Sequence, residues 1–101
     1  MKTITYKELS NLLGNFVSVS NAPSRNGMGK APNQFIIEFE NGRVLQSYET
    51  PVAAKCNGQL YFGSYHDYSA TTNRFVKDFC GRNKNERNKL LENDEAILFE
   101  V

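Results

Sequence analysis

The sequence is poor in the residues from which metal sites and disulfide frameworks are built. It contains one histidine, His66, and two cysteines, Cys56 and Cys80, without CxxC spacing. These are too few for a standard zinc site made of histidine and cysteine alone. We therefore expect no metal, no cofactor and two reduced thiols in a cytoplasmic protein, while a disulfide between the two cysteines stays open.

Strong net charge and long apolar runs are also absent. The 12 basic and 11 acidic residues give a formal net charge of +1, which disfavours both a strongly basic nucleic-acid binder and an acidic mimic of DNA. The N-terminal segment MKTITYKELSNLLG has no unbroken apolar stretch, so we expect neither a signal peptide nor a membrane anchor there. The length of 101 residues favours one domain spanning residues 1–101.

The motifs of familiar catalytic sites are missing as well. Neither GxSxG nor HExxH occurs, and Gly27-Met-Gly-Lys30 lacks the spacing of a phosphate-binding loop. His66 and Asp67 are adjacent, and neighbouring side chains on a strand point to opposite sides, so the sequence does not place them in contact. We therefore predict that the protein is not an enzyme. A hydrolase or nuclease that uses His66 and Asp67 is the weaker alternative.

Three short helices are predicted from capping residues and apolar periodicity. Thr5 and Glu8 fit a capping box, Ser69 is the preferred N-cap of the second helix, and Asn83 begins the third. The second helix has the clearest apolar stripe. The expected helices span residues 6–13, 70–80 and about 84–91.

Strands are predicted from alternation and from turn signals. Residues 34–40 alternate between apolar and polar side chains, and Asn41-Gly42 follows as a hairpin signal that requires positive φ. Asn57-Gly58 repeats this signal, and Pro51 indicates a bulge or a sheet edge. The expected strands span about residues 16–19, 34–40, 43–49, 52–56, 59–65 and 96–101. The pattern predicts an α+β fold, a twisted antiparallel sheet of about five to six strands with two or three short helices packed on one face.

Residues 20–32, SNAPSRNGMGKAP, consist mostly of turn-forming residues. They include Arg25 and Lys30 and no acidic residue. Because no periodicity runs through them, we expect a long flexible loop, and loops of this length are commonly functional or disordered. Arg25 and Lys30 are therefore a predicted second contact with a partner.

The segment LYFGSYHDYSATTNR, residues 60–74, concentrates groups that can bind a partner. If Leu60 and Phe62 face the core, Tyr61 and Tyr65 face outward, with Tyr48 nearby. Exposed tyrosines beside arginine and histidine are typical of protein interfaces. The alternative, that helices cover this face and bury the tyrosines, stays open. The predicted partner-binding residues here are Tyr61, Tyr65, His66, Tyr68 and Arg74.

The same segment permits a second interpretation, as a site for a nucleotide or single-stranded nucleic acid. A helix N-terminus offers free N–H groups, so Ser69, Thr71, Thr72 and Arg74 could hold phosphate while tyrosines stack on bases. The basic residues within 82–89 could extend the surface. The competing explanation is ordinary helix capping. Phosphate binding would weaken steeply with salt, whereas salt-insensitive association would indicate a protein partner.

Three short stretches form a recognisable pattern: Ser47-Tyr48-x-Thr50-x-Val52-Ala53, Gly58-x-Leu60-Tyr61 and Asp67-Tyr68-Ser69-x-Thr71-Thr72-x-Arg74. The pattern resembles small bacteriophage proteins that carry a domain of unknown function, and it covers about Phe35 to Phe79. Where that family often has His or Tyr, this chain has Phe75. The resemblance implies a phage or prophage source and, by analogy, an inhibitor of host defence.

We therefore expect a small phage-encoded, non-enzymatic protein that binds and inhibits a host protein or nucleoprotein complex in the cytoplasm of an infected bacterium. A CRISPR–Cas or other immune nuclease complex is the expected target, which would make the protein an anti-CRISPR. Nucleic acid is the alternative partner, and no membrane partner is expected. A homodimer through an exposed strand edge, at Pro51 or at the final strand, also stays open.

Overall fold

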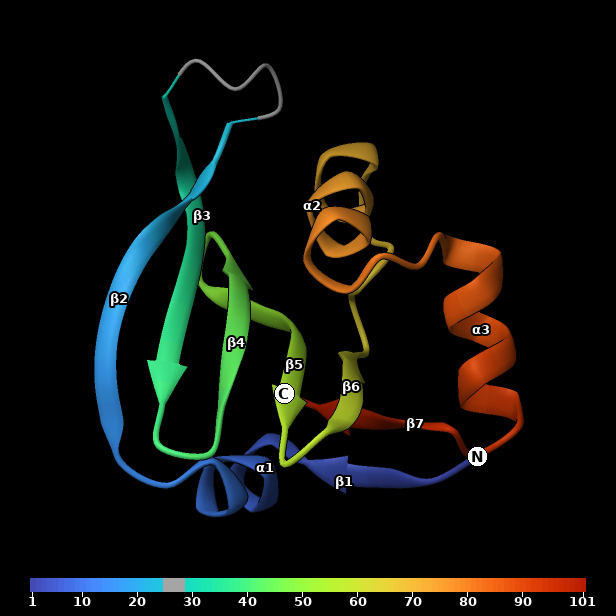
Figure 1. Cartoon of the computed structure of the whole chain (residues 1–101). Coiled ribbons are helices and arrows are strands. Elements are labelled where there is room, and N and C mark those ends of the chain that lie inside the picture. Colours follow the sequence, from blue (N-terminus) through green and yellow to red (C-terminus); the bar gives the residue numbers. More distant parts are fainter. Residues whose placement is uncertain (25–28) are drawn as a thin grey trace.

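A computed structural model describes residues 1–24 and 29–101, which form an α+β fold built on one mixed sheet (Figure 1). The strand order across the sheet is β1-β7-β6-β5-β4-β3-β2. The elements are β1 (Thr3–Thr5), α1 (Tyr6–Leu13), β2 (Phe16–Pro23), β3 (Lys30–Phe39), β4 (Gly42–Ser47), β5 (Thr50–Cys56), β6 (Gln59–Gly63), α2 (Ala70–Cys80), α3 (Lys84–Glu92) and β7 (Ala96–Glu100).

The three predicted helices are confirmed, together with their caps. The Thr5 hydroxyl accepts from the Glu8 backbone N–H at 3.1 Å, and the Glu8 carboxylate accepts from the Thr5 N–H at 3.0 Å. Ser69 caps α2 by accepting from the Thr72 N–H at 3.1 Å. Asn83 begins α3 with a second capping box. Each cap satisfies a backbone donor that the helix itself leaves unpaired.

The antiparallel meander predicted from the sequence is confirmed for β3, β4, β5 and β6, which pair in chain order. Leu45 pairs with Ala53 but Gln46 pairs with Pro51, so β5 has one additional residue at this point. The predicted bulge at Pro51 is therefore confirmed. A bulge accommodates proline because the regular ladder is already interrupted there.

The prediction of a purely antiparallel sheet of five to six strands is wrong in two respects. The sheet formed by the described residues has seven strands, and the pairs at the β1 side of the sheet are parallel. β7 lies between β6 and β1 and pairs in parallel with both. The helices α2 and α3 carry the chain back before β7 begins, and such a crossover makes the strand parallel to β6. Three-residue β1 was missed because its alternation is too short to detect. The edges are β1 and β2, so neither Pro51 nor the final strand is an exposed edge.

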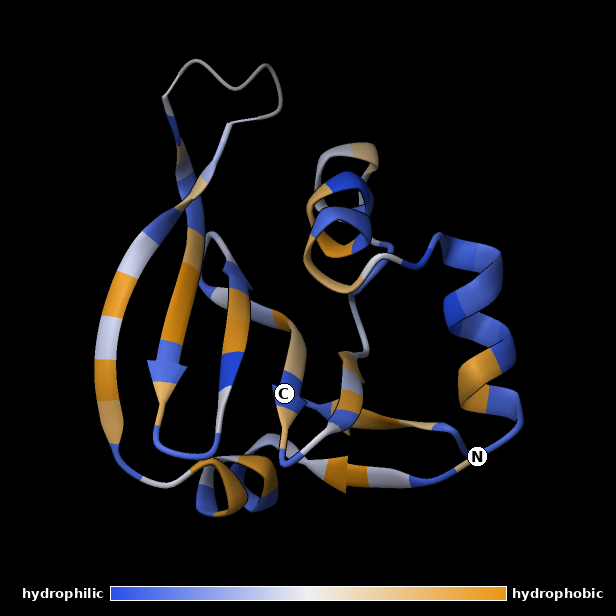
Figure 2. Cartoon of the chain, in the orientation of Figure 1, coloured by the Kyte–Doolittle hydropathy of each residue, from blue (hydrophilic) through white to orange (hydrophobic). Residues whose placement is uncertain are grey.

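The helices cover both faces of the sheet, not one face as predicted. Adjacent residues on each strand point to opposite faces, and they belong to different apolar clusters: Leu45 packs under α2 and α3, whereas Val44 packs with Leu9 and Leu13 of α1. Figure 1 shows α1 apart from α2 and α3, and Figure 2 shows apolar residues along the strands between them. Each face therefore has its own core.

Both ends of the predicted loop over residues 20–32 are strands in the structure. Residues 20–23 belong to β2 and residues 30–32 belong to β3, and the Asn21 side chain donates to the Ala31 carbonyl at 3.0 Å. Edge strand β2 tolerates Pro23 because a shift of register lies between Asn21 and Pro23. Arg25, with residues 26–28, lies outside the described residues.

The two Asn-Gly pairs have different roles. Asn57 and Gly58 have φ of 51° and 81°, as the predicted hairpin turn requires. Gly42 instead begins β4 without positive φ, and a Cβ placed on it would lie 2.0 Å from the Lys55 carbonyl oxygen. The sequence signal at Gly42 therefore reflects a close approach between β4 and β5, not a special turn conformation.

We expect Gly42→Ala to lower the free energy of unfolding by more than about 2 kcal/mol, because backbone atoms of a central strand must move. Gly58→Ala is the matched control, since its Cβ would meet nothing within 4 Å and only positive φ opposes it, at about 1 kcal/mol. Urea denaturation of both variants measures the difference. Equal losses would show that the close approach at Gly42 does not constrain the sheet.

Candidate functional site

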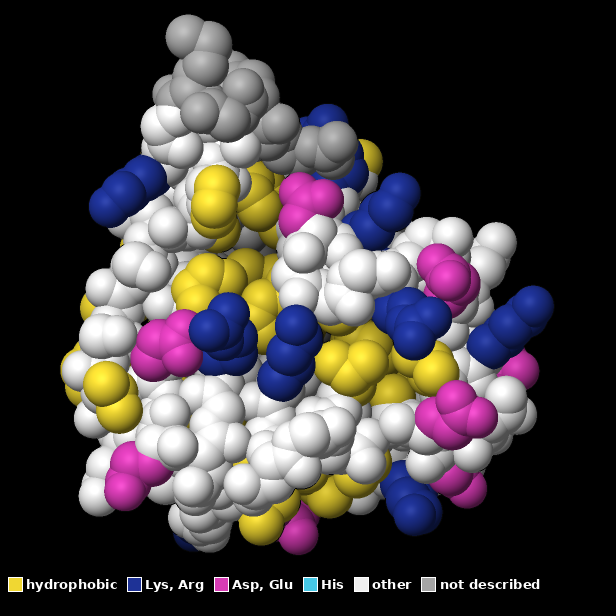
Figure 3. Space-filling view, viewed as in Figure 1, with side chains coloured by type: hydrophobic (Ala, Val, Ile, Leu, Met, Phe, Trp, Pro, Cys, Tyr) yellow, Lys and Arg dark blue, Asp and Glu magenta, His cyan; other side chains and the backbone are white. Residues whose placement is uncertain are grey.

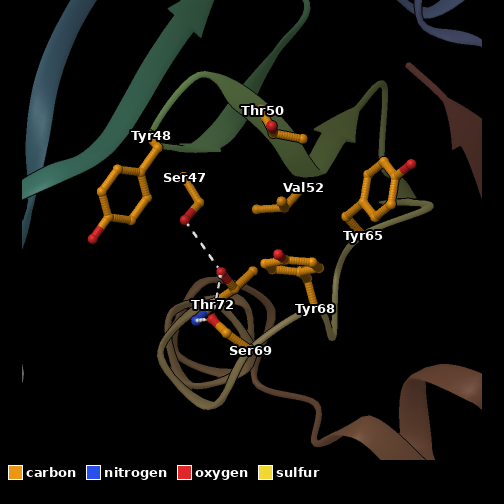
Figure 4. A pocket seen from close by; sticks show the side chains of 8 residues that line it. All are labelled: Ser47, Tyr48, Thr50, Val52, Tyr65, Tyr68, Ser69 and Thr72. Atoms are coloured by element: carbon orange, nitrogen blue, oxygen red, sulfur yellow. Dashed lines mark hydrogen bonds between the residues drawn. The ribbon is translucent and has the colours of Figure 1, made fainter.

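A pocket of about 470 Å³ opens between the β4–β5 turn and the N-terminal end of α2 (Figure 4). Its volume falls within the range of about 300–1,000 Å³ typical of small-molecule sites. None of the described residues that line it is charged. Those residues are Ser47, Tyr48, Thr50, Val52, Tyr65, Tyr68, Ser69 and Thr72.

Hydroxyl groups form the floor of this pocket. The buried Gln34 amide donates to the Ser47 hydroxyl at 2.9 Å, and the Ser47 and Thr72 hydroxyls lie 3.3 Å apart. The Ser69 hydroxyl donates to Thr72 Oγ1 at 3.1 Å. This network joins β3, β4 and α2. In this orientation of the Gln34 amide, its Oε1 is buried without a hydrogen-bond partner among the described residues.

Tyr48 lies at one side of the pocket in a conformation that is uncommon for a large side chain. Its φ is 55°, and it is the first of two residues in the turn between paired residues Ser47 and Thr50. A two-residue turn with positive φ only at its first central position is normally formed by glycine there. The Tyr48 N–H donates to the Asn33 carbonyl at 2.6 Å, and Gln46 Nε2 donates to the Tyr48 carbonyl at 3.1 Å. These bonds hold the turn.

Tyr65 and Tyr68 form the rest of the rim. Both come from the segment between β6 and α2, and their rings meet edge to face with centroids 6.2 Å apart. Tyr48, Tyr65 and Tyr68 have exposed fractions of 61%, 52% and 79%. Figure 4 shows Tyr48 and Tyr65 on opposite sides of the hydroxyl floor. The structure thus brings together two predicted contact residues and Tyr48, which the sequence indicated only as a neighbour.

The prediction that Tyr61 faces outward is wrong. Tyr61 is 6% exposed and packs in the core beneath α1 with Val44 and Phe99. The alternation was read correctly, because Phe62 does face the opposite core. The error came from expecting helices on one face of the sheet only. In the structure α1 covers the other face, on which Tyr61 lies.

His66 is also buried, at 5% exposed, and cannot contact a partner. Its Nδ1 accepts a hydrogen bond from Nε of the fully buried Arg87 at 3.0 Å, and its ring lies 5.6 Å from that of Phe62. Burial, and then the Arg87 cation, lower the pKa of His66 below its usual value. His66 is therefore neutral at pH 7 and helps to position the Tyr65–Tyr68 segment.

The groups considered for catalysis are not assembled. Asp67 pairs with Lys84 at 3.6 Å, and the described residues include no hydrogen bond between Asp67 and His66. Cys56 and Cys80 are free thiols that belong to cores on opposite faces of the sheet, and burial raises the pKa of each. A raised pKa makes a thiol a poor nucleophile at neutral pH.

Within the part of the chain that the structure describes, no cluster of three or more His, Cys, Asp or Glu side chains could hold a metal ion. No helix in that part is both long and apolar enough to cross a membrane.

The four residues of the alternative phosphate site do not form one site in the structure. Ser69 and Thr72 line the pocket, but their hydroxyls bond to each other and Ser69 also caps α2. Thr71 and Arg74 are exposed and do not line this pocket. Phe75, the position singled out in the sequence pattern, is a buried core residue.

The basic residues that the structure describes do not converge on the pocket. Lys30 is exposed at the start of β3, Arg25 lies outside the described residues, and Arg87 is buried inside the segment expected to be a basic surface. On the face seen in Figure 3, lysine and arginine side chains are interspersed with aspartate and glutamate. The described residues on this face therefore form no continuous basic patch of the kind that nucleic-acid binding favours.

We expect Tyr48→Gly to be more stable than Tyr48→Ala by about 1 kcal/mol, since alanine retains the strain of positive φ and glycine removes it. At Tyr68, which has no positive φ, the order should reverse. Urea denaturation of the four variants tests the comparison. If Tyr48→Ala proved the more stable of its pair, the strain assigned to Tyr48 would be absent.

The depressed pKa of His66 predicts a loss of stability in mild acid. The unfolded chain binds a proton below about pH 6.5, whereas the folded chain resists protonation beside Arg87, so the free energy of unfolding falls as pH drops below that value. Below the folded-state pKa of His66 the loss levels off. His66→Gln keeps an acceptor for Arg87 without titrating, and its stability should depend less on pH between 7 and 5. If the free energy of unfolding of His66→Gln fell with decreasing pH as steeply as that of the unaltered protein, His66 would not be the cause of the pH dependence.

Comparison with known proteins places the chain in a family. No curated protein and no solved structure matched it. Residues 18–95 match the model of a family of unknown function, DUF8033, and this range includes every residue that lines the pocket. Because the match extends over more than half of the chain, the protein belongs to the DUF8033 family of unknown function.

Proposed function

We propose that this protein is a non-catalytic binding protein that docks on a partner protein through the pocket rimmed by Tyr48, Tyr65 and Tyr68. The partner is a protein of a bacterial host, and binding inhibits it. The resemblance to small phage proteins supports immune nuclease complexes, including CRISPR–Cas complexes, as the first partner class to test.

The observation that carries this proposal is the grouping of three exposed tyrosines around one concave surface. Each is more than half exposed, although large aromatic side chains gain free energy when they are buried. Tyrosine is enriched in interface hot spots, and such residues cluster around pockets. Tyr48 retains a strained backbone at a position that glycine would occupy without cost, and strain of this kind is concentrated at functional sites.

The uncharged lining supports a protein partner over a phosphate-bearing one. Binding of a nucleotide or single strand depends on cationic side chains beside the stacking rings, and the lining residues that the structure describes include none. A neutral, aromatic and hydroxyl-rich surface instead suits the desolvated centre of a protein interface, from which charged residues are depleted.

Affinity capture from a bacterial lysate treated with nuclease tests the proposal. The tagged protein should retain one stoichiometric protein, and Tyr65→Ala and Tyr68→Ala should each weaken its binding by roughly 30-fold or more, as expected for hot-spot residues. The melting temperatures should change little because both side chains are exposed. Phe16→Ala is the matched control: Phe16 is 60% exposed and meets Phe39 edge to face at 6.3 Å, but it lies on β2 away from the pocket.

Three results would reject the proposal. One is a captured protein whose binding is unaffected by either tyrosine variant. The second is equal loss in the Phe16→Ala control. The third is recovery of nucleotide or nucleic acid, with no enriched protein, from a parallel sample not treated with nuclease, which would favour the alternative binding function.

A further inference from the structure

We propose that the pocket receives one uncharged aromatic side chain of the partner, a tyrosine, whose phenol oxygen accepts a hydrogen bond from the pocket floor. This inference rests on the proposed function, because it takes the pocket to be the docking site for a protein. It adds the chemical class of the group that is bound and the atoms that select it.

A count of hydroxyl hydrogens on the floor supports the hydrogen bond. Ser69 donates its hydrogen to Thr72 Oγ1, and Ser47 Oγ already accepts from the Gln34 amide. Only one hydrogen is needed for the contact between Ser47 and Thr72, and either hydroxyl can supply it. The other hydroxyl keeps its hydrogen, and no other described residue accepts a hydrogen bond from either group. One O–H donor is therefore left over within the pocket.

The position of this donor makes it selective. Ser47 and Thr72 both line the pocket, yet they are only 5% and 6% exposed. A ligand that covers the floor without accepting the spare hydrogen leaves a buried donor unpaired, which costs free energy. A ligand with an acceptor at the edge of its ring avoids that cost. The floor therefore distinguishes a phenol from an unsubstituted phenyl ring.

The rim and the walls select the ring itself. Tyr65 and Tyr68 already meet edge to face, which is a favoured arrangement of aromatic pairs and leaves ring surface open to a third ring. Tyr48 supplies a ring on the opposite side, and Val52 adds an apolar contact. The described lining residues carry no charge, which favours a neutral group over a carboxylate, an ammonium or a phosphate.

Titration of the ¹⁵N-labelled full chain with capped amino acids, followed by NMR, tests the inference. The probes are N-acetyl-tyrosinamide, N-acetyl-phenylalaninamide, N-acetyl-leucinamide and uridine, each in the millimolar range. Both aromatic amides should shift backbone resonances of residues 47–52 and 65–72. The tyrosine amide should bind about 2- to 12-fold more tightly than the phenylalanine amide, the effect of one neutral hydrogen bond. The leucine amide should bind more weakly than either.

The double variant Ser47→Ala/Thr72→Val removes both hydroxyls that can present the spare hydrogen. It should still bind the rings but lose the preference for tyrosine, and its melting curve reports whether it folds. If it does not fold, selectivity of the unaltered protein among the four probes still decides the question, with Phe16→Ala as a folded control that should keep that selectivity.

Specific results would overturn the inference. Equal affinity for the two aromatic amides would indicate that the Gln34 amide is reversed and absorbs the spare hydrogen. If uridine bound more tightly than the tyrosine amide, the bound group would be a nucleobase and not an amino-acid side chain. If no amide binds while Tyr68→Ala still weakens protein capture, a tyrosine is not the bound group, but the proposal of protein docking stands. If tyrosine binds but no protein is captured, the ligand class stands and the proposed function fails.

Discussion

The buried guanidinium of Arg87 is the interaction on which the arrangement around the pocket depends. Arg87 donates to His66 at 3.0 Å, to the Arg82 carbonyl at 2.8 Å and to the Asn73 side chain, so α3, α2, their linker and the Tyr65–Tyr68 segment meet at one cation. The described residues include no carboxylate paired with it. Because a buried charge without acceptors is very costly, these neutral acceptors must stay in place. The segment that carries two rim tyrosines is therefore fixed by a contact behind the pocket.

Local features of the fold were predictable because they depend on nearest neighbours. The capping pairs Thr5–Glu8 and Asn83–Glu86 and the N-cap Ser69 are satisfied within a few residues, so the helices begin where their sequences indicate. The parallel pairing of β7 was not predictable in the same way. It depends on how α2 and α3 return the chain, and no short sequence pattern records that path.

The candidate site was predictable only in part, for a related reason. Tyr65 and Tyr68 stand out in the sequence, and they do form the rim. Tyr61 and His66 lie in the same short segment and looked equally suited to contact a partner, yet α1 covers Tyr61 and Arg87 holds His66 in the core. The alternation of a strand assigns side chains to faces but does not say which face is covered. Tyr48 was expected within a strand over residues 43–49, so its turn position was not predicted; the unused sequence signal was the hydroxyl-bearing stretch Ser47-Tyr48-Glu49-Thr50.

The parallel pairing of β7 with β1 also has a consequence for the order in which the chain can fold. β1 comprises residues 3–5, but its partner comprises residues 96–100. On the ribosome, β1 must wait unpaired until the residues of β7 have been synthesised. Pairing between segments so distant in sequence carries a large loop-closure entropy and slows folding. Until Phe99 is in place, Leu9 and Leu13 of α1 lack one of their core neighbours, so the core beneath α1 is completed only when β7 docks.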